Sequence, residues 1–82
     1  MQILILEDEE QALSRLKKLI TEVVPDALIC GTASSVEETI NWFEHNPMPD
    51  LIFMDIQLAD GISFQLFNKI KITCPVIFTT AY

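Results

Sequence analysis

Residues 50–61 read DLIFMDIQLADG. Four consecutive apolar residues, 51–54, run directly into Asp55, and a turn of polar and small residues follows. A short, wholly apolar run is typical of a strand buried on both faces of a parallel sheet. The acid at its end is either a cap for the next helix or a group with a chemical role.

The residues around this stretch predict alternating strands and helices. Helical periodicity appears in the apolar residues between positions 12 and 23, which Pro25 ends, and again from Ser35, whose spacing to Glu38 has the form of a capping box. A short third helix is expected around 66–70, and Trp42 is expected on the outer face of the second helix. Strands are expected at 2–6, 27–31, 51–54 and 75–79. This βαβαβαβ order predicts a parallel sheet with helices on both faces.

The composition predicts one small cytoplasmic domain. Eighty-two residues with a net charge of −7 argue against direct binding to nucleic acid or an anionic membrane, because both are polyanions. No segment has the ~20 apolar residues of a membrane span, and no basic leader precedes the first apolar run. Cys30 and Cys74 lie in apolar runs, too few for a disulfide framework or zinc motif, and are expected to be buried reduced thiols.

Polar side chains follow three of the predicted strands. Glu7 and Asp8 come after the first, Asp55 after the third, and Thr79 and Thr80 at the end of the fourth. In open α/β sheets, ligands bind beyond the carboxyl ends of the strands. If the first and third strands are neighbours, three carboxylates therefore converge on one edge and repel one another unless a cation lies among them.

Magnesium is the cation that fits this set, since it prefers carboxylates, carbonyls and water. The main-chain carbonyl of Gln57, two residues after Asp55, is a further candidate ligand. With the metal in place, Asp55 could attack phosphorus as a carboxylate nucleophile and form an aspartyl phosphate. The hydroxyl of Thr80 could then donate to a phosphoryl oxygen.

Helix capping is the competing interpretation for each acid taken alone. A lone aspartate after a strand is most often a cap or a turn residue, and Asp60, before Gly61, is expected to be one of these. Capping also competes for Glu7 and Asp8 at the start of the first helix. The combination of acids after the first and third strands with threonines after the fourth favours the chemical interpretation.

Three motifs carry a resemblance to a known family. The segments LILEDE, LIFMDIQLADG and PVIFTTAY resemble the receiver domain of two-component response regulators, and DIQLADGISF with IFTTAY is similar to receivers of the LytR/AgrA (LytTR) type. The resemblance covers the whole chain. It implies a flavodoxin-like, doubly wound sheet with strand order 2-1-3-4. It also implies that residues 1–82 are the N-terminal portion of the domain, without its fifth strand and last two helices.

The resemblance also implies roles for individual residues. Asp55 would accept the phosphoryl group, Asp8 would be the main acidic Mg²⁺ ligand, Glu7 would hold the metal through water, and the Gln57 carbonyl would complete the protein's share. Thr80 would follow phosphorylation, with Ala81 leaving room beside it. The donor would be the phosphohistidine of a sensor histidine kinase, and the output a DNA-binding domain that is absent here. Such a domain catalyses at most its own phosphorylation.

Ending at Tyr82 has two expected consequences. Family receivers carry a lysine after the fifth strand that pairs with the phosphoryl group, so residues 1–82 alone should be phosphorylated slowly or not at all. The fourth strand would also be an open apolar edge, so the chain is expected to self-associate, as a homodimer, by edge pairing or strand exchange.

Two other functions compete with a phosphoacceptor. One is a receiver-like module that dimerises without being phosphorylated. The other is a phosphatase of the haloacid dehalogenase type, which needs a second aspartate two residues after the first. That position is Gln57 here, which cannot serve as a general acid.

Overall fold

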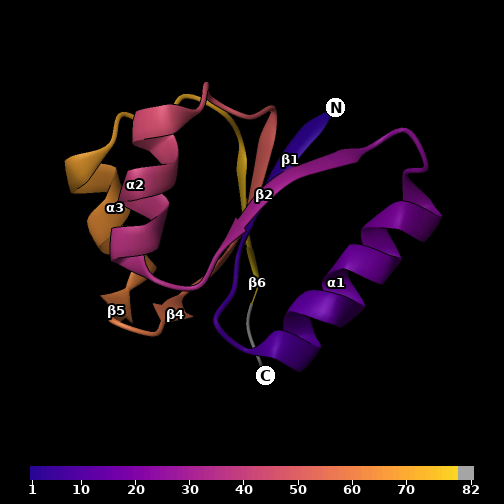
Figure 1. Cartoon of the computed structure of the whole chain (residues 1–82), viewed down its shortest axis with the longest axis horizontal. Coiled ribbons are helices and arrows are strands. Elements are labelled where there is room, and N and C mark those ends of the chain that lie inside the picture. Colours follow the sequence, from indigo (N-terminus) through magenta and orange to yellow (C-terminus); the bar gives the residue numbers. More distant parts are fainter. Residues whose placement is uncertain (80–82) are drawn as a thin grey trace.

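The computed structural model describes residues 1–79, which form a four-stranded parallel sheet with helices on both faces (Figure 1). The strand order β2-β1-β3-β6 confirms the predicted order 2-1-3-4, since β6 is the fourth predicted strand. A two-stranded antiparallel hairpin lies outside the sheet. The elements are β1 (Gln2–Leu6), α1 (Glu10–Val23), β2 (Leu28–Ala33), α2 (Val36–His45), β3 (Leu51–Asp55), β4 (Gln57–Leu58), β5 (Gly61–Ile62), a 3₁₀ turn (Ser63–Gln65), α3 (Leu66–Lys69) and β6 (Val76–Thr79).

Alternation along the central strands builds a core on each face of the sheet. On one face Leu4, Ile52 and Met54 are fully buried and pack with residues of α2 and α3. On the other, Ile3 and Ile5 pack with Ile20 and the apolar stripe of α1. The middle strands are therefore apolar throughout, as a sheet covered on both sides requires.

The pairing of β1 with β3 places their ends next to each other. The two strands are parallel, and Leu6 pairs with Met54, the last residue before Asp55. On the far side of β3, Asp55 pairs with Thr79 of β6. The predicted adjacency of the first and third strand exits is therefore confirmed, and the carboxyl ends of β1, β3 and β6 form one continuous edge.

Several local predictions need correction. The second strand begins one residue later than expected and extends to Ala33, because it stays paired with β1 as far as Leu6. The turn after Asp55 is a β-hairpin, in which Gly61 has the positive φ of 150° that favours glycine. The third helix is one turn of α-helix after a 3₁₀ turn. Cys30 and Cys74 are partly buried, and burial raises the pKa of both thiols.

Trp42 lies against the core, so its predicted place on the outer face of α2 is wrong. The indole packs against the cluster beneath α2 and covers Gly31 of β2, where a Cβ atom would collide with the indole ring. The missing side chain at Gly31 therefore gives the large ring its space. The periodicity of α2 did not reveal this contact because it joins the helix to a strand that is distant in the sequence.

Replacing Gly31 with alanine is expected to destabilise the chain by about 1–3 kcal/mol, since overpacking forces side chains or backbone to shift. Urea unfolding followed by circular dichroism measures the change in midpoint. The double variant Gly31→Ala/Trp42→Phe should recover part of the loss, because the smaller ring relieves the collision. An unchanged midpoint in Gly31→Ala would contradict the packing described here.

Large hydrophobic side chains remain exposed on both faces of β6. Ile77 is 46% exposed and Phe78 is 41% exposed. Phe78 also contacts Phe64 and Phe67, at ring-centroid distances of 5.3 and 6.3 Å. Within residues 1–79, β6 pairs with β3 alone and is an edge of the sheet.

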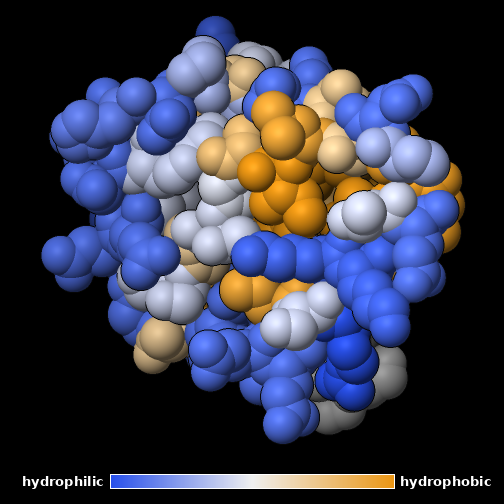
Figure 2. Space-filling model, turned by 45° about the vertical axis from the view of Figure 1, so that its right-hand side comes forward, coloured by the Kyte–Doolittle hydropathy of each residue, from blue (hydrophilic) through white to orange (hydrophobic). Residues whose placement is uncertain are grey.

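Figure 2 shows hydrophobic side chains gathered on one face of the molecule, bordered by hydrophilic ones. No helix in residues 1–79 combines the length and the apolar character needed to cross a bilayer.

Candidate functional site

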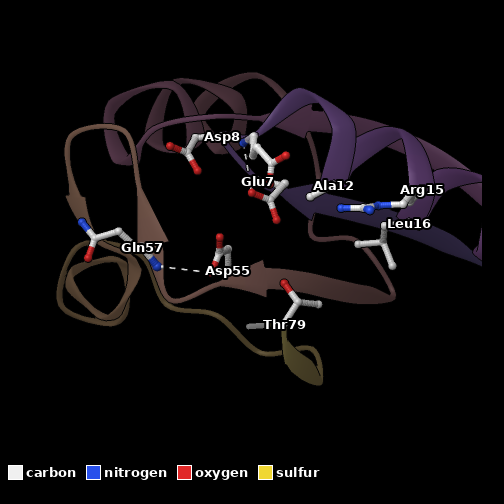
Figure 3. Close-up of a pocket in the computed structure, with 9 residues that line it drawn as sticks. Glu7, Asp8, Ala12, Arg15, Leu16, Asp55, Gln57 and Thr79 are labelled. Carbon is white, nitrogen blue, oxygen red and sulfur yellow. Dashed lines mark hydrogen bonds between the residues drawn. The ribbon is translucent and has the colours of Figure 1, made fainter. Parts of the chain in front are cut away.

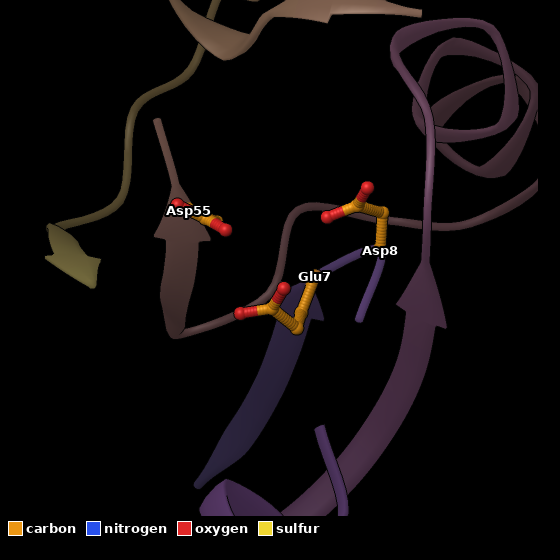
Figure 4. A group of neighbouring side chains, drawn as sticks. All are labelled: Glu7, Asp8 and Asp55. Atoms are coloured by element: carbon orange, nitrogen blue, oxygen red, sulfur yellow. The ribbon is translucent and has the colours of Figure 1, made fainter. Parts of the chain in front are cut away.

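Three carboxylates meet at the carboxyl edge of the sheet (Figure 4). Glu7 and Asp8 follow β1 directly, and Asp55 is the last residue of β3. One carboxylate oxygen from each residue lies within 4.8 Å of the other two. Glu7 is buried, with 9% of its surface exposed, Asp55 is half-buried and Asp8 is exposed. The cluster is therefore reachable from solvent but is held at its base by the sheet.

The backbone around Glu7 is fixed by hydrogen bonds on both sides. Its N–H donates to the carbonyl of Ala33 at 2.9 Å, next to the β1–β2 ladder. Its side-chain oxygen accepts the N–H of Glu9 at 3.0 Å, where α1 begins. The turn from β1 into α1 thus sets the orientation of the Glu7 carboxylate toward Asp55, and the position of the cluster follows from the fold.

The carboxylates line a cleft of about 480 Å³ between α1 and the ends of β3 and β6 (Figure 3). Thr79 contributes a hydroxyl from β6, and Arg15 is the one basic side chain among the lining residues within 1–79. The sequence analysis did not single out Arg15; its three-residue spacing from Ala12 on α1 was the available signal. The lining residues are Glu7, Asp8, Glu9, Ala12, Arg15, Leu16, Asp55, Gln57 and Thr79.

The charges in the cluster oppose one another. Burial raises the pKa of Glu7 above its usual range, against the lowering effect of the Glu9 N–H, and the charges of Asp55 and Asp8 raise it further. The ionised form of a buried carboxylate beside two like charges is unfavourable unless a positive charge lies nearby. Hard oxygen donors in close proximity are the ligands that Mg²⁺ prefers, so the residues present fit this cation.

The structure tests the helix-cap interpretation for Asp55. The residues after Asp55 form β4, so the helix-cap interpretation is wrong for this aspartate. Its carboxylate accepts the N–H of Gln57 at 3.4 Å, a long and weak contact (Figure 3). Asp60, predicted to be a cap or a turn residue, is both, since it lies in the hairpin turn and its carboxylate accepts N–H groups at the start of α2. The Asp55 carboxylate thus remains available to a ligand.

The structure brings four of the predicted site residues into one cleft. Glu7, Asp8, Asp55 and Gln57 all line it, although they come from two stretches of the chain, 7–8 and 55–57. Thr80 and Ala81 lie outside the described residues. Glu7 also accepts the N–H of Glu9, the N-cap residue of α1, so its carboxylate has a contact at the helix start as well as a place in the cleft.

Comparison with known proteins identifies the family of the chain. The chain matches the response regulator receiver domain family over residues 3–82. It is 35% identical to the sensory transduction protein LytT of Bacillus anthracis over an alignment of 85 positions, which covers all of this chain and 34% of that protein. The chain thus spans about a third of the length of LytT. This similarity agrees with the LytR/AgrA-type resemblance.

Solved structures of response regulators share the fold. The response regulator PhyR from Brucella abortus is 30% identical with a TM-score of 0.83, over 99% of this chain and 33% of that one. The MaeR response regulator bound to beryllium trifluoride has a TM-score of 0.82 at 21% identity, over 100% of this chain and 68% of that one, and bears on the fold alone. With this strand order and a family match over residues 3–82, the chain belongs to the response regulator receiver domains of two-component signalling.

Proposed function

We propose that this chain is the phosphoacceptor module of a response regulator and that Asp55 receives the phosphoryl group. The observation that carries the proposal is the half-buried Asp55 carboxylate, uncommitted to a helix, within 4.8 Å of two further carboxylates in an open cleft. Carboxylates this close to one another repel, and a bound cation would offset that repulsion. The family membership supplies the context, a sensor histidine kinase as the donor.

In the proposed transfer, an Asp55 oxygen attacks phosphorus and a P–O bond forms. The P–N bond to the donor histidine breaks, its electron pair stays on the imidazole nitrogen, and that nitrogen takes a proton from solvent. The product is an acyl phosphate on Asp55. Glu7 and Asp8 would hold Mg²⁺ with Asp55 and the Gln57 carbonyl, and Thr80 would donate to the phosphoryl group. When bound, the metal supplies positive charge to the phosphoryl oxygens.

The rest of the protein is part of the same proposal. We infer that residues 1–82 are the N-terminal portion of a receiver domain acting in the cytoplasm. The inference is supported by the share of longer proteins that the chain covers, 34% of LytT and 68% of the MaeR chain. A DNA-binding output domain would follow. Reading the codons after Tyr82 tests this: a lysine after another apolar strand, then a basic domain, is expected.

Mapping the modified residue tests the function. The full-length gene product that contains this sequence is incubated with Mg²⁺ and acetyl phosphate, or with its kinase. Peptide mass analysis then locates the added phosphoryl group, which is expected on Asp55. Absence of any modification would favour the dimerisation module. Turnover of a small phosphoester would favour the phosphatase, which the glutamine at position 57 disfavours.

The 82-residue chain itself is expected to self-associate through β6. Its backbone groups facing away from β3 are unpaired within residues 1–79, and Ile77 and Phe78 expose hydrophobic surface on the two faces beside it. Such edges pair with other strands. Gel filtration with light scattering should show a dimer, and Ile77→Lys should weaken it, because a charge on an edge strand opposes pairing. A folded wild-type monomer would contradict this expectation.

A further inference from the structure

The hairpin that follows Asp55 is fastened to the start of α2. Asp60 lies in the hairpin turn, and its carboxylate oxygens accept the N–H groups of Val36 at 2.6 Å and Glu37 at 3.1 Å. The N–H of Ala59 donates to the carbonyl of Ser34 at 3.1 Å. Three hydrogen bonds therefore join the two-residue turn of the hairpin to the start of α2, about 24 residues earlier in the chain (Figure 1).

The same hairpin carries Gln57, the proposed carbonyl ligand. Gln57 pairs with Ile62 in a hairpin only two residue pairs long. At its base, the Ser63 N–H donates to the carbonyl of Ile56 at 2.8 Å, and Leu58 anchors one strand in the core at 2% exposed. A two-stranded hairpin of this length is not stable by itself. The conformation of the hairpin therefore depends on the contacts at its base and at its turn. The same contacts set the path of the backbone that follows Asp55.

Helix α2 does not depend on Asp60 for its own cap. Ser35 is the N-cap residue, and its hydroxyl accepts the N–H of Glu38 at 3.0 Å. Asp60 accepts the N–H groups of Val36 and Glu37, which the Ser35 hydroxyl does not bind. These hydrogen bonds lower the pKa of Asp60, so its carboxyl group is ionised at neutral pH. A negative carboxylate at the positive end of a helix is a favourable contact. The contact thus ties the hairpin to a helix that already has its own cap.

We propose that Asp60 is a positioning residue for the acidic cleft: by holding the β4–β5 hairpin on α2, it fixes the backbone from Asp55 to Gln57. The metal part of this inference rests on the proposed function. Coupling of this kind is reciprocal, so a ligand that orders the segment from Asp55 to Gln57 also stabilises the contact with α2. The first turn of α2 then responds to the state of the cleft without touching it.

The experiment compares Asp60→Ala with Ser35→Ala, because both remove a cap from the same helix but the Ser35 hydroxyl bonds to Glu38 of that helix and not to the hairpin. Amide hydrogen exchange of Ser63 is measured by NMR in the metal-free chain, and Mg²⁺ binding by calorimetry. We expect exchange of the Ser63 amide to rise about five- to tenfold in Asp60→Ala, a change typical of losing a capping contact. Mg²⁺ binding should weaken about tenfold, as when a residue that orients a ligand is lost.

The controls separate positioning from general destabilisation. Ser35→Ala should leave Ser63 exchange and Mg²⁺ binding within about twofold of wild type, since the hairpin contact is intact. Asp60→Asn should recover part of both effects, because its amide oxygen still accepts one N–H. Equal Ser63 exchange in wild type and Asp60→Ala, or an equal rise in Ser35→Ala, overturns the inference. A further outcome is that the wild type binds no Mg²⁺ while exchange of the Ser63 amide rises in Asp60→Ala alone. That result upholds the hairpin contact, and the proposed metal site is then wrong.

Discussion

Replacing Asp55 with asparagine is expected to abolish phosphorylation of the full-length gene product by acetyl phosphate or by its kinase. Asparagine has almost the same shape as aspartate, but its amide has no anionic oxygen to attack phosphorus. The fold should survive, because Asp55 is half-buried and the hydrogen bond that its carboxylate accepts from the Gln57 N–H is long. Intact-mass spectrometry should show the phosphoryl adduct in wild type and none in Asp55→Asn.

The matched control is Asp50→Asn, at the opposite end of the same strand. Asp50 precedes β3, and its carboxylate accepts the N–H of Gln2 at 2.7 Å, far along the sheet from the acidic cluster. The two variants remove one negative charge each from positions flanking a single strand. Asp50→Asn should be phosphorylated like wild type. If Asp55→Asn still takes up a phosphoryl group, the acceptor is another residue and the proposed function is wrong.

The sequence predicts the sheet well because each central strand is buried on both faces. The runs 2–6 and 51–54 have no polar residue after Gln2, and such runs leave little choice of partner or face. Burial confirms this, since Leu4, Leu6, Ile52 and Met54 are fully enclosed. Once strands of this kind alternate with helices, the right-handed crossover restricts the topology to few arrangements, and the exits of β1 and β3 come together.

Features that depend on contacts between distant segments were not visible in the sequence. The packing of Trp42 on Gly31 joins α2 to β2 across the layer, and local periodicity does not report it. The β4–β5 hairpin has two residues in each strand, too few for an alternating pattern. Asp60 was predicted to be a cap or a turn residue, but the helix whose N–H groups it accepts begins 24 residues earlier in the chain. Local patterns identified the residue types, and only tertiary structure identified their partners.

Replacing Asp8 with alanine is expected to weaken Mg²⁺ binding by about tenfold or more, because affinity for a hard dication depends on the number of charged oxygen ligands. The metal-free chain should not lose stability in parallel. The charge of Asp8 is one of the causes that raise the pKa of Glu7, so removing it relieves repulsion in the cluster. Calorimetric titration of residues 1–82 with Mg²⁺ measures the first effect, and urea unfolding without metal measures the second.

Glu10→Ala is the control for the loss of one negative charge near the cleft. Glu10 is exposed in the first turn of α1 and does not line the cleft. Its removal should leave the binding heat unchanged and cost about 0.3–1 kcal/mol of stability, since an acid favours the start of a helix. The two variants, two residues apart in the chain, are thus expected to behave in opposite ways. Asp8→Ala loses metal binding and keeps its stability, whereas Glu10→Ala loses stability and keeps metal binding. Equal binding heats from wild type and Asp8→Ala would exclude Asp8 from the metal site, and the acidic cluster would then need another explanation.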